Sequence, residues 1–133
     1  MTDDLTTQMH RAMPFTAVLG ATAVRAGPDE VALRLDWDGT RCTSGGLLHG
    51  GALMALADAA GGWCAFLNLP DGATGTATVT SATNFVRPVT SGHVDAVASV
   101  LHAGRSTLVI DTELRDAAGK RVARVTQTQA VLR

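Results

Sequence analysis

The stretch LLHGGALMALADAAGGWCAFLNL, residues 47–69, decides the fold, because it is apolar on nearly every side of a helix and rich in Ala and Gly. A helix that is apolar all round is buried, either in a protein core or in a membrane. Asp58 lies near its middle, where a lone carboxylate in a membrane costs about 2–3 kcal/mol or more. The stretch therefore predicts a central helix in a protein core, with small side chains that let strands approach closely.

Strand patterns dominate the sequence that follows this helix. A turn at residues 70–72 comes first, and four stretches with strand periodicity follow it. These stretches cover residues 74–87, 93–103, 106–115 and 121–132. Because the connections between them are short, we expect consecutive strands to pair as antiparallel neighbours in a four-strand meander.

The sequence before the central helix predicts a leading helix and a hairpin. Residues 2–13 favour a helix that Thr2 caps, that Asp3 and Asp4 stabilise through the helix dipole, and that Pro14 ends. A short apolar stretch at 14–19, strands at 21–26 and 31–36, and a polar glycine-bearing loop at 38–46 follow in chain order. The whole order predicts one α+β domain over residues 1–133, with an antiparallel sheet curled around one long buried helix.

Composition and charge narrow the class of protein. The chain has 133 residues, of which 46% are hydrophobic and 17% charged, as in a globular domain. Its 11 basic and 12 acidic residues give a net charge of -1, so we expect no nucleic-acid or membrane partner. Cys42 and Cys64 lie outside any CxxC or Cys/His cluster, which argues against a disulfide framework and a metal site. The N-terminus lacks a signal-peptide pattern, so we expect a cytoplasmic protein.

The start of the central helix is the first candidate site. Residues 45–51 contain four glycines around Leu47, Leu48 and His49. Glycines at this position expose backbone N–H groups that the helix itself cannot satisfy, and such groups can hold an oxyanion or a polarised carbonyl. The alternative is a glycine-rich junction between loop and helix in which His49 is merely packed.

Asp58 is the second candidate. A carboxyl group inside an apolar helix must find a partner, face a cleft or bind a proton. A carboxyl group that faces a cleft or holds a proton is suited to act as a general base or acid. The alternative is a structural Asp that is hydrogen-bonded to a neighbouring strand or paired with an Arg.

The distance between the two candidate sites predicts how two chains assemble. Gly50 and Asp58 are eight residues apart, which on one helix is about 12 Å along the axis. They cannot both touch one small carbonyl centre within a single chain. If both are catalytic, two chains must meet with antiparallel helices, which predicts a C2 dimer with two equivalent sites at the interface. Exposed strand edges would be hidden if the two sheets joined edge to edge.

Several motifs resemble one enzyme family. The run GLLHGG at 46–51, followed by LAD at 56–58, resembles the motif GxxHGGxxxxLAD of the hotdog-fold acyl-CoA thioesterases of the phenylacetate-degradation type. TNFVRP at 83–88 resembles their strand ending in FxRP, and Gly104-Arg105 is also similar. The resemblance covers nearly the whole chain and implies the hotdog fold.

The resemblance also implies roles for individual residues. The Gly50 N–H donates to the thioester oxygen, and His49 orients the loop and the substrate. Asp58 of the partner chain acts on water as general base, or attacks as nucleophile. A Ser or Thr on the next strand supports the water. Thr76, Thr78 and Thr80 alternate along that strand, so we expect them to share one face. Thr78 matches the family's position best, with Thr80 as the second choice.

Five further residues are candidates for supporting roles. Thr43 stands where many members carry an Asn or Gln that holds the water or the carbonyl, and its shorter side chain predicts a weaker or altered activity. Arg87 and Arg105 are candidates for binding the phosphates of coenzyme A, although surface arginines on strands are common. Trp63 and Phe66 either pack in the core or line a pocket for an aryl group.

The sequence thus predicts hydrolysis of an acyl- or aryl-acyl-CoA by a homodimer or homotetramer whose sites lie at the subunit interface. Coenzyme A enters as part of the substrate, and the predicted chemistry needs no separate cofactor. The alternatives are a non-catalytic acyl-CoA-binding hotdog protein, suggested by Thr43, a hotdog dehydratase or hydratase, and a purely structural oligomer.

Overall fold

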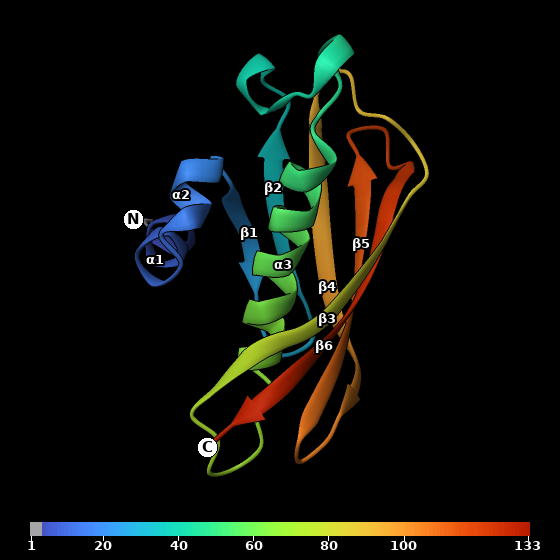
Figure 1. Cartoon of the computed structure of the whole chain (residues 1–133). Coiled ribbons are helices and arrows are strands. Elements are labelled where there is room, and N and C mark those ends of the chain that lie inside the picture. Colours follow the sequence, from blue (N-terminus) through green and yellow to red (C-terminus); the bar gives the residue numbers. More distant parts are fainter. Residues whose placement is uncertain (1–3) are drawn as a thin grey trace.

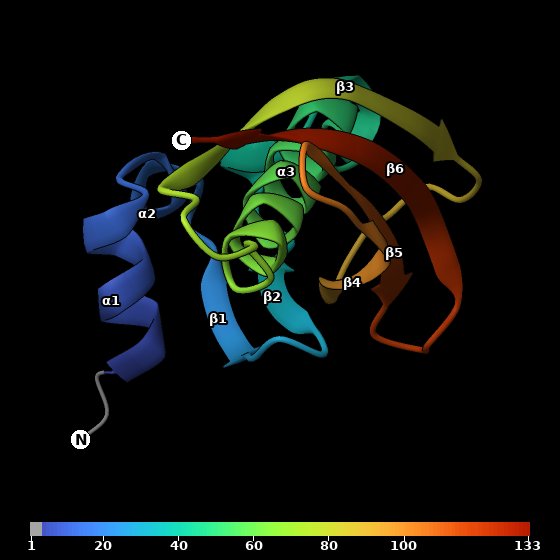
Figure 2. The same ribbon diagram turned by 90° about the horizontal axis from the view of Figure 1, so that it is seen from below.

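Residues 4–133, which the computed structural model describes, form a six-stranded antiparallel sheet that curls around helix α3 (Gly50–Phe66) (Figures 1 and 2). The other elements, in chain order, are α1 (Asp4–Ala12), α2 (Phe15–Leu19), β1 (Thr22–Ala26), β2 (Val31–Asp36), β3 (Gly75–Phe85), β4 (His93–Ala103), β5 (Thr107–Asp116) and β6 (Arg121–Leu132). This is the predicted α+β architecture. The expected cap at Thr2 and the charge at Asp3 lie outside the described residues.

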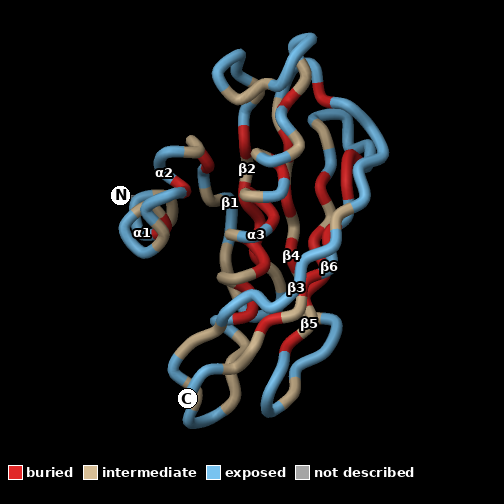
Figure 3. The backbone as a smooth tube through the Cα atoms, in the orientation of Figure 1, coloured by how far each residue is buried: buried red, intermediate tan, exposed pale blue. Residues whose placement is uncertain are grey.

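Helix α3 is buried on one face and exposed on the other (Figure 3). Its buried residues recur every three or four positions and pack against the concave side of the sheet: Leu53, Leu56, Ala57, Ala60, Gly61, Cys64 and Ala65. On the opposite face, Met54 is 42% and Phe66 55% exposed, and Asp58 is exposed as well. The expectation that this helix is buried all round, with Asp58 inside an apolar core, is therefore wrong for the single chain.

The strand order differs from the predicted meander. The sheet runs β1-β2-β4-β5-β6-β3, so that β3 pairs with β6 at one end and β4 pairs with β2. Of the four strands that follow α3, only β4, β5 and β6 pair in the order of the sequence. The sheet therefore closes around α3 by bringing its third and sixth strands together.

The connection from β3 to β4 explains this difference. Residues 86–92 exceed the roughly 2–5 residues of a tight hairpin loop. The Val86 N–H donates to the Val122 carbonyl of β6 at 2.8 Å, and the Val89 carbonyl accepts from the Leu48 N–H at 3.0 Å. Val89 is also buried. The connection thus crosses from the β6 edge to the start of α3 before it enters β4.

The N-terminal helices lie beside α3 and β1 (Figure 2). Met9 of α1 is buried in the core, and Gly20, with φ of +87°, ends α2 in the left-handed conformation that glycine tolerates best. Arg41 ties the next loop to this region, because its Nε donates to the Leu19 carbonyl at 2.7 Å. Within residues 4–133, no helix has the length and apolar character needed to cross a membrane.

Candidate active site

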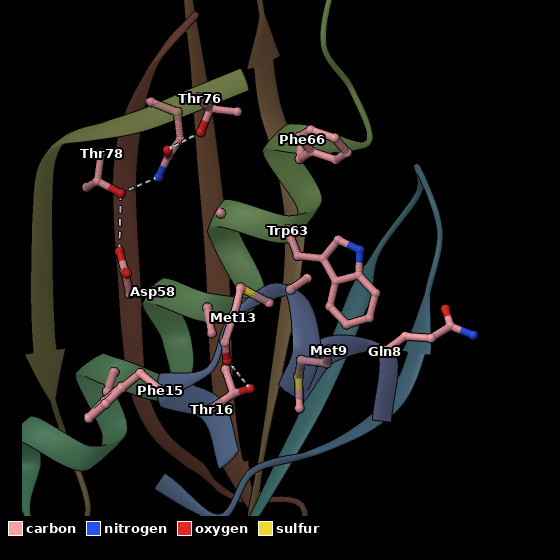
Figure 4. A pocket seen from close by; sticks show the side chains of 15 residues that line it. Gln8, Met9, Met13, Phe15, Thr16, Asp58, Trp63, Phe66, Thr76 and Thr78 are labelled. Atoms are coloured by element: carbon pink, nitrogen blue, oxygen red, sulfur yellow. Dashed lines mark hydrogen bonds between the residues drawn. The ribbon is translucent and has the colours of Figure 1, made fainter. Parts of the chain in front are cut away.

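A hollow of about 750 Å³ opens between α1, α2, α3 and the start of β3 (Figure 4). One wall is apolar and includes Met9, Met13, Phe15, Trp63 and Phe66. The other wall is polar and includes Asp58, Thr76, Thr78 and Gln129. Asp58 is the only ionisable side chain among the described residues that line this hollow. The space therefore suits a neutral, largely apolar group that is held next to one carboxylate.

Asp58 is held by two neighbouring strands at one edge of the sheet. Its Oδ1 accepts a hydrogen bond from Thr78 Oγ1 of β3 at 3.2 Å, and another from Gln127 Nε2 of β6 at 3.2 Å. The structure thus brings Asp58 together with Thr78, one of its two candidate partners. It has hydrogen-bonded partners on the strands and also faces the hollow, so the structural and functional interpretations are compatible.

Thr80 does not take part in this cluster. The pairing of β3 with β6 shifts register between Thr78 and Thr80, so that Thr78 lies opposite Gln129 while Thr80 lies opposite Thr128. Side chains alternate along a strand, and the extra residue, Val79, reverses the side on which the next ones lie. The expectation that Thr76, Thr78 and Thr80 share one face is therefore wrong at Thr80.

Two buried amides of β6 were missed in the sequence. Gln127 is fully buried and Gln129 is 1% exposed. Gln129 Nε2 donates to Thr78 Oγ1 at 2.7 Å, and Gln129 Oε1 accepts from Thr76 Oγ1 at 2.6 Å. The available signal was the alternation along the strand, because the other residues of the same parity between positions 123 and 131 are apolar: Ala123, Val125 and Val131.

The helix start forms a second, smaller hollow. It measures about 350 Å³, and its lining includes Thr43, Gly50, Phe85 and Arg87. A Cβ at Gly50 would lie 3.2 Å from Phe85 Cζ, so the ring closes over the glycine. Among residues 4–133, no group accepts a hydrogen bond from the Gly50 N–H.

His49 is the N-cap of α3. Its Nδ1 accepts a hydrogen bond from the Gly51 N–H at 2.8 Å, which leaves the proton of the neutral imidazole on Nε2. The cap satisfies the second amide of the helix and not the first. The first amide, that of Gly50, has no acceptor among the described residues, and Gly50 lines the small hollow.

The candidate residues thus fall into separate groups. Asp58 and Thr78 line the large hollow, whereas Gly50, Thr43 and Arg87 line the small one. Arg105 belongs to neither. It lies in the β4–β5 turn, at the end of the sheet where α3 finishes (Figure 1), and its carbonyl accepts from Arg133 Nη1 at 2.8 Å.

Cys42 and Cys64 lie outside the lining of both hollows. Both cysteines are free, and burial raises the pKa of the Cys64 thiol. Residues 4–133 hold no cluster of three or more His, Cys, Asp or Glu side chains that could bind a metal ion.

Comparison with known proteins gives consistent matches. Residues 45–123 match the model of the Thioesterase superfamily. The chain is 32% identical over 114 residues to EntH, a proofreading thioesterase of Cronobacter sakazakii, covering 86% of this chain and 82% of that protein.

Solved structures agree with this match. The thioesterase HI1161 of Haemophilus influenzae superimposes with a TM-score of 0.88 at 25% identity, covering 98% of this chain and 92% of that one. The PaaI protein of the E. coli phenylacetic acid degradation operon superimposes with a TM-score of 0.84, covering 96% of this chain and 90% of that one. At 21% identity, this second likeness concerns the fold alone.

Proposed function

Because this chain belongs to the thioesterase superfamily and is a thioester hydrolase, we propose that it cleaves acyl-CoA thioesters at sites shared between two protomers. Each site takes Asp58 from one protomer and the Gly50 N–H from the other. The observation behind this proposal is that Asp58 lines the large hollow, whereas Gly50 lines the small one at another position on the same helix. One thioester carbonyl cannot reach both within a single chain.

The exposed face of α3 supports an antiparallel arrangement of two chains. Met54 and Phe66 leave large apolar surfaces in solvent near Asp58. Strand β3 pairs with β6 on one side, and most of its residues are exposed. Two copies that join along these surfaces bury apolar area and cover the free strand edge. With helices antiparallel, the Gly50 end of one α3 then lies alongside Asp58 of the other.

The proposed chemistry is the addition of water to the thioester carbonyl. Asp58 removes a proton from water as the water oxygen bonds to the carbonyl carbon, and the carbonyl oxygen becomes negative. The Gly50 N–H donates to this oxygen, and such a donor can lower the barrier by about 2.7–4 kcal/mol. The C–S bond then breaks, and the thiolate of coenzyme A leaves and takes up a proton. A direct attack by Asp58, giving an anhydride that water hydrolyses, uses the same geometry.

The other candidate residues take supporting roles in this proposal. Thr78 helps to hold the carboxylate of Asp58, and Thr43, beside Gly50, offers a hydroxyl where an amide is common. Arg87 lies beside the small hollow, and an antiparallel dimer brings Arg105 of the partner subunit toward the same end. The two guanidinium groups would then bind the phosphates of coenzyme A.

The acyl group itself fits the large hollow. Trp63, Phe66, Met9 and Met13 offer it an apolar wall, and no cation among the described lining residues favours an acidic acyl group. We therefore expect phenylacetyl, hydroxybenzoyl and medium-chain acyl-CoAs to be better substrates than those that carry a second carboxylate.

Release of free thiol from a panel of acyl-CoAs tests this function. Asp58→Asn removes the base but keeps the size of an exposed side chain, so the protein should remain folded while kcat falls by about 10²–10⁴-fold. Asp71→Asn, in the exposed turn after α3, makes the same chemical change away from both hollows and should leave kcat unchanged. Full activity in Asp58→Asn would show that Asp58 is not the base.

The same panel separates hydrolysis from the non-catalytic alternative. An acyl-CoA-binding protein would bind these thioesters tightly and release no thiol from any of them. In that case Thr43→Asn is the next variant, because it restores the amide that is common at this position.

A further inference from the structure

The buried amide of Gln127 makes an unusual contact in the interior of the sheet. Its side chain is fully buried on β6, and its Nε2 donates to Asp58 Oδ1 at 3.2 Å. The two residues are 69 positions apart in the sequence. This contact connects the last strand of the chain to the proposed catalytic carboxylate.

A glycine of α3 makes room for this amide. A Cβ at Gly61 would lie 1.6 Å from Gln127 Oε1 and 2.5 Å from its Cδ, far closer than atoms can approach. Gly61 is itself buried in the middle of the helix. The helix therefore has a recess at the one place where the amide reaches past it toward Asp58.

Among the described residues, the side-chain amide of Gln127 makes one hydrogen bond, which is the one to Asp58. Gln127 Oε1 is buried and has no hydrogen-bond partner among the described residues. A buried acceptor without a partner lowers the stability of the fold. Turning the amide over would place its oxygen against the carboxylate oxygen, which is repulsive. An apolar side chain in this recess would avoid both problems, so the amide serves the carboxylate and not the stability of the core.

We propose that Gln127 is a positioning residue that fixes the orientation of the Asp58 carboxylate, and that Gly61 is the recess that admits it. This inference rests on the proposed role of Asp58 as the base. A second chain of donors acts in the same direction: Thr76 donates to Gln129, Gln129 donates to Thr78, and Thr78 donates to Asp58.

Both chains end on the same oxygen. Oδ1 accepts from Thr78 and from Gln127, whereas Oδ2 accepts no hydrogen bond from the described residues. Oδ2 is therefore free to take the proton of water. The carboxylate is held by one oxygen and reacts with the other, and loss of the Gln127 donor would let the group rotate about its Cβ–Cγ bond.

Gln127→Met tests this role, because Met has a similar length and no amide. We expect kcat to fall about 10- to 100-fold, with KM within twofold and an unfolding midpoint in urea that is no lower than that of the native protein. Gln127→Asn is the second variant, since it keeps an amide but withdraws it by one methylene, and the same loss of kcat is expected.

Thr112→Val is the matched control. Thr112 on β5 is also fully buried, and its Oγ1 also lacks a partner, but it does not contact Asp58. This variant should be at least as stable as the native protein and keep its kcat. Unchanged kcat in both Gln127 variants, or an equal loss in Thr112→Val, would overturn the positioning role.

Two comparisons separate this inference from the proposed function. If Asp58→Asn is inactive and Gln127→Met is fully active, only the positioning role fails. If no thioester is turned over, crystal structures of the native protein and Gln127→Met still decide the matter. A single Asp58 orientation in the first and a rotated or split carboxylate in the second support the role, and identical carboxylates overturn it.

Discussion

At the scale of single residues, His49 caps the start of α3 and Gly50 supplies the first backbone N–H of the helix. The imidazole accepts the Gly51 N–H at 2.8 Å and thereby does what Ser, Thr, Asp or Asn usually does at an N-cap. It leaves the N–H of Gly50, a residue that lines the small hollow, without an acceptor among the described residues. A side chain that capped the first amide would stabilise the helix and remove the donor that the proposed chemistry needs.

Replacement of His49 tests the cap directly. We expect His49→Ala to lower the free energy of unfolding by about 1 kcal/mol, and His49→Asn to recover most of this loss, because Asn is a good N-cap. Urea denaturation of the three proteins measures the difference. Equal stability of His49→Ala and the native protein would mean that the imidazole contributes nothing as a cap.

At the scale of elements, α3 carries two neighbouring glycines in opposite surroundings. A Cβ at Gly61 would overlap the Gln127 amide, whereas a Cβ at Gly62 would meet no atom within 4 Å. Glycine inside a helix is less favourable than alanine by about 0.8–1.0 kcal/mol. The two positions therefore differ in the reason for glycine, although they look alike in the sequence.

The pair of alanine variants separates these reasons. Gly62→Ala should raise the free energy of unfolding by up to about 1 kcal/mol, because it gains helix propensity and clashes with nothing. Gly61→Ala should lower it, because the core must shift around Gln127. Thermal unfolding of both variants checks the prediction, and a stabilised Gly61→Ala would show that the recess is not needed.

The elements themselves were largely predictable, and their arrangement was less so. Local patterns gave the central helix, predicted over 47–69 and observed at 50–66, and they gave the strands 93–103 and 121–132 with the bounds that the structure has. The pairing of β3 with β6 depends on contacts far apart in sequence. The patterns predict a strand that runs to residue 87 and a short link to the next strand, whereas β3 ends at Phe85 and the connection covers 86–92.

The site was predictable where the motif is local. Gly50 and Asp58 lie in one motif, and Thr78 follows on the next strand. The bulge at Val79, which turns Thr80 away, leaves no mark in a run of alternating threonines. Gln127 was missed because a glutamine in a strand is equally compatible with a solvent-exposed position.

At the scale of the whole molecule, the single chain leaves its proposed site in two halves. The described residues place a carboxylate in one hollow and a free N–H in another. In the proposed dimer each half meets the complementary half of the partner, so two incomplete hollows become two complete sites. Activity then requires assembly as well as folding.

Mixed dimers test this sharing of sites. Gly50→Pro removes the N–H, and proline is tolerated at the first helical position. Gly50→Pro and Asp58→Asn should each be inactive alone, but a heterodimer of the two has one intact site. A randomly assembled equal mixture should therefore recover about a quarter of the native rate in thiol release, since half of the dimers are mixed and each has half its sites. Verified heterodimers without activity would contradict shared sites.

The pairing of β3 with β6 also governs how the protein is made. Strand β3 is synthesised soon after α3, but its hydrogen-bonding partner β6 is the last of the described strands to be synthesised. Until β6 is available, the nascent chain exposes the apolar surface of α3 and the unpaired edge of β3. Both features make this stage prone to aggregation with other chains. The contacts of Gln127 with Asp58 and of Gln129 with Thr78 form at the same late step. The environment of the proposed catalytic carboxylate is thus completed only after β6 has been synthesised.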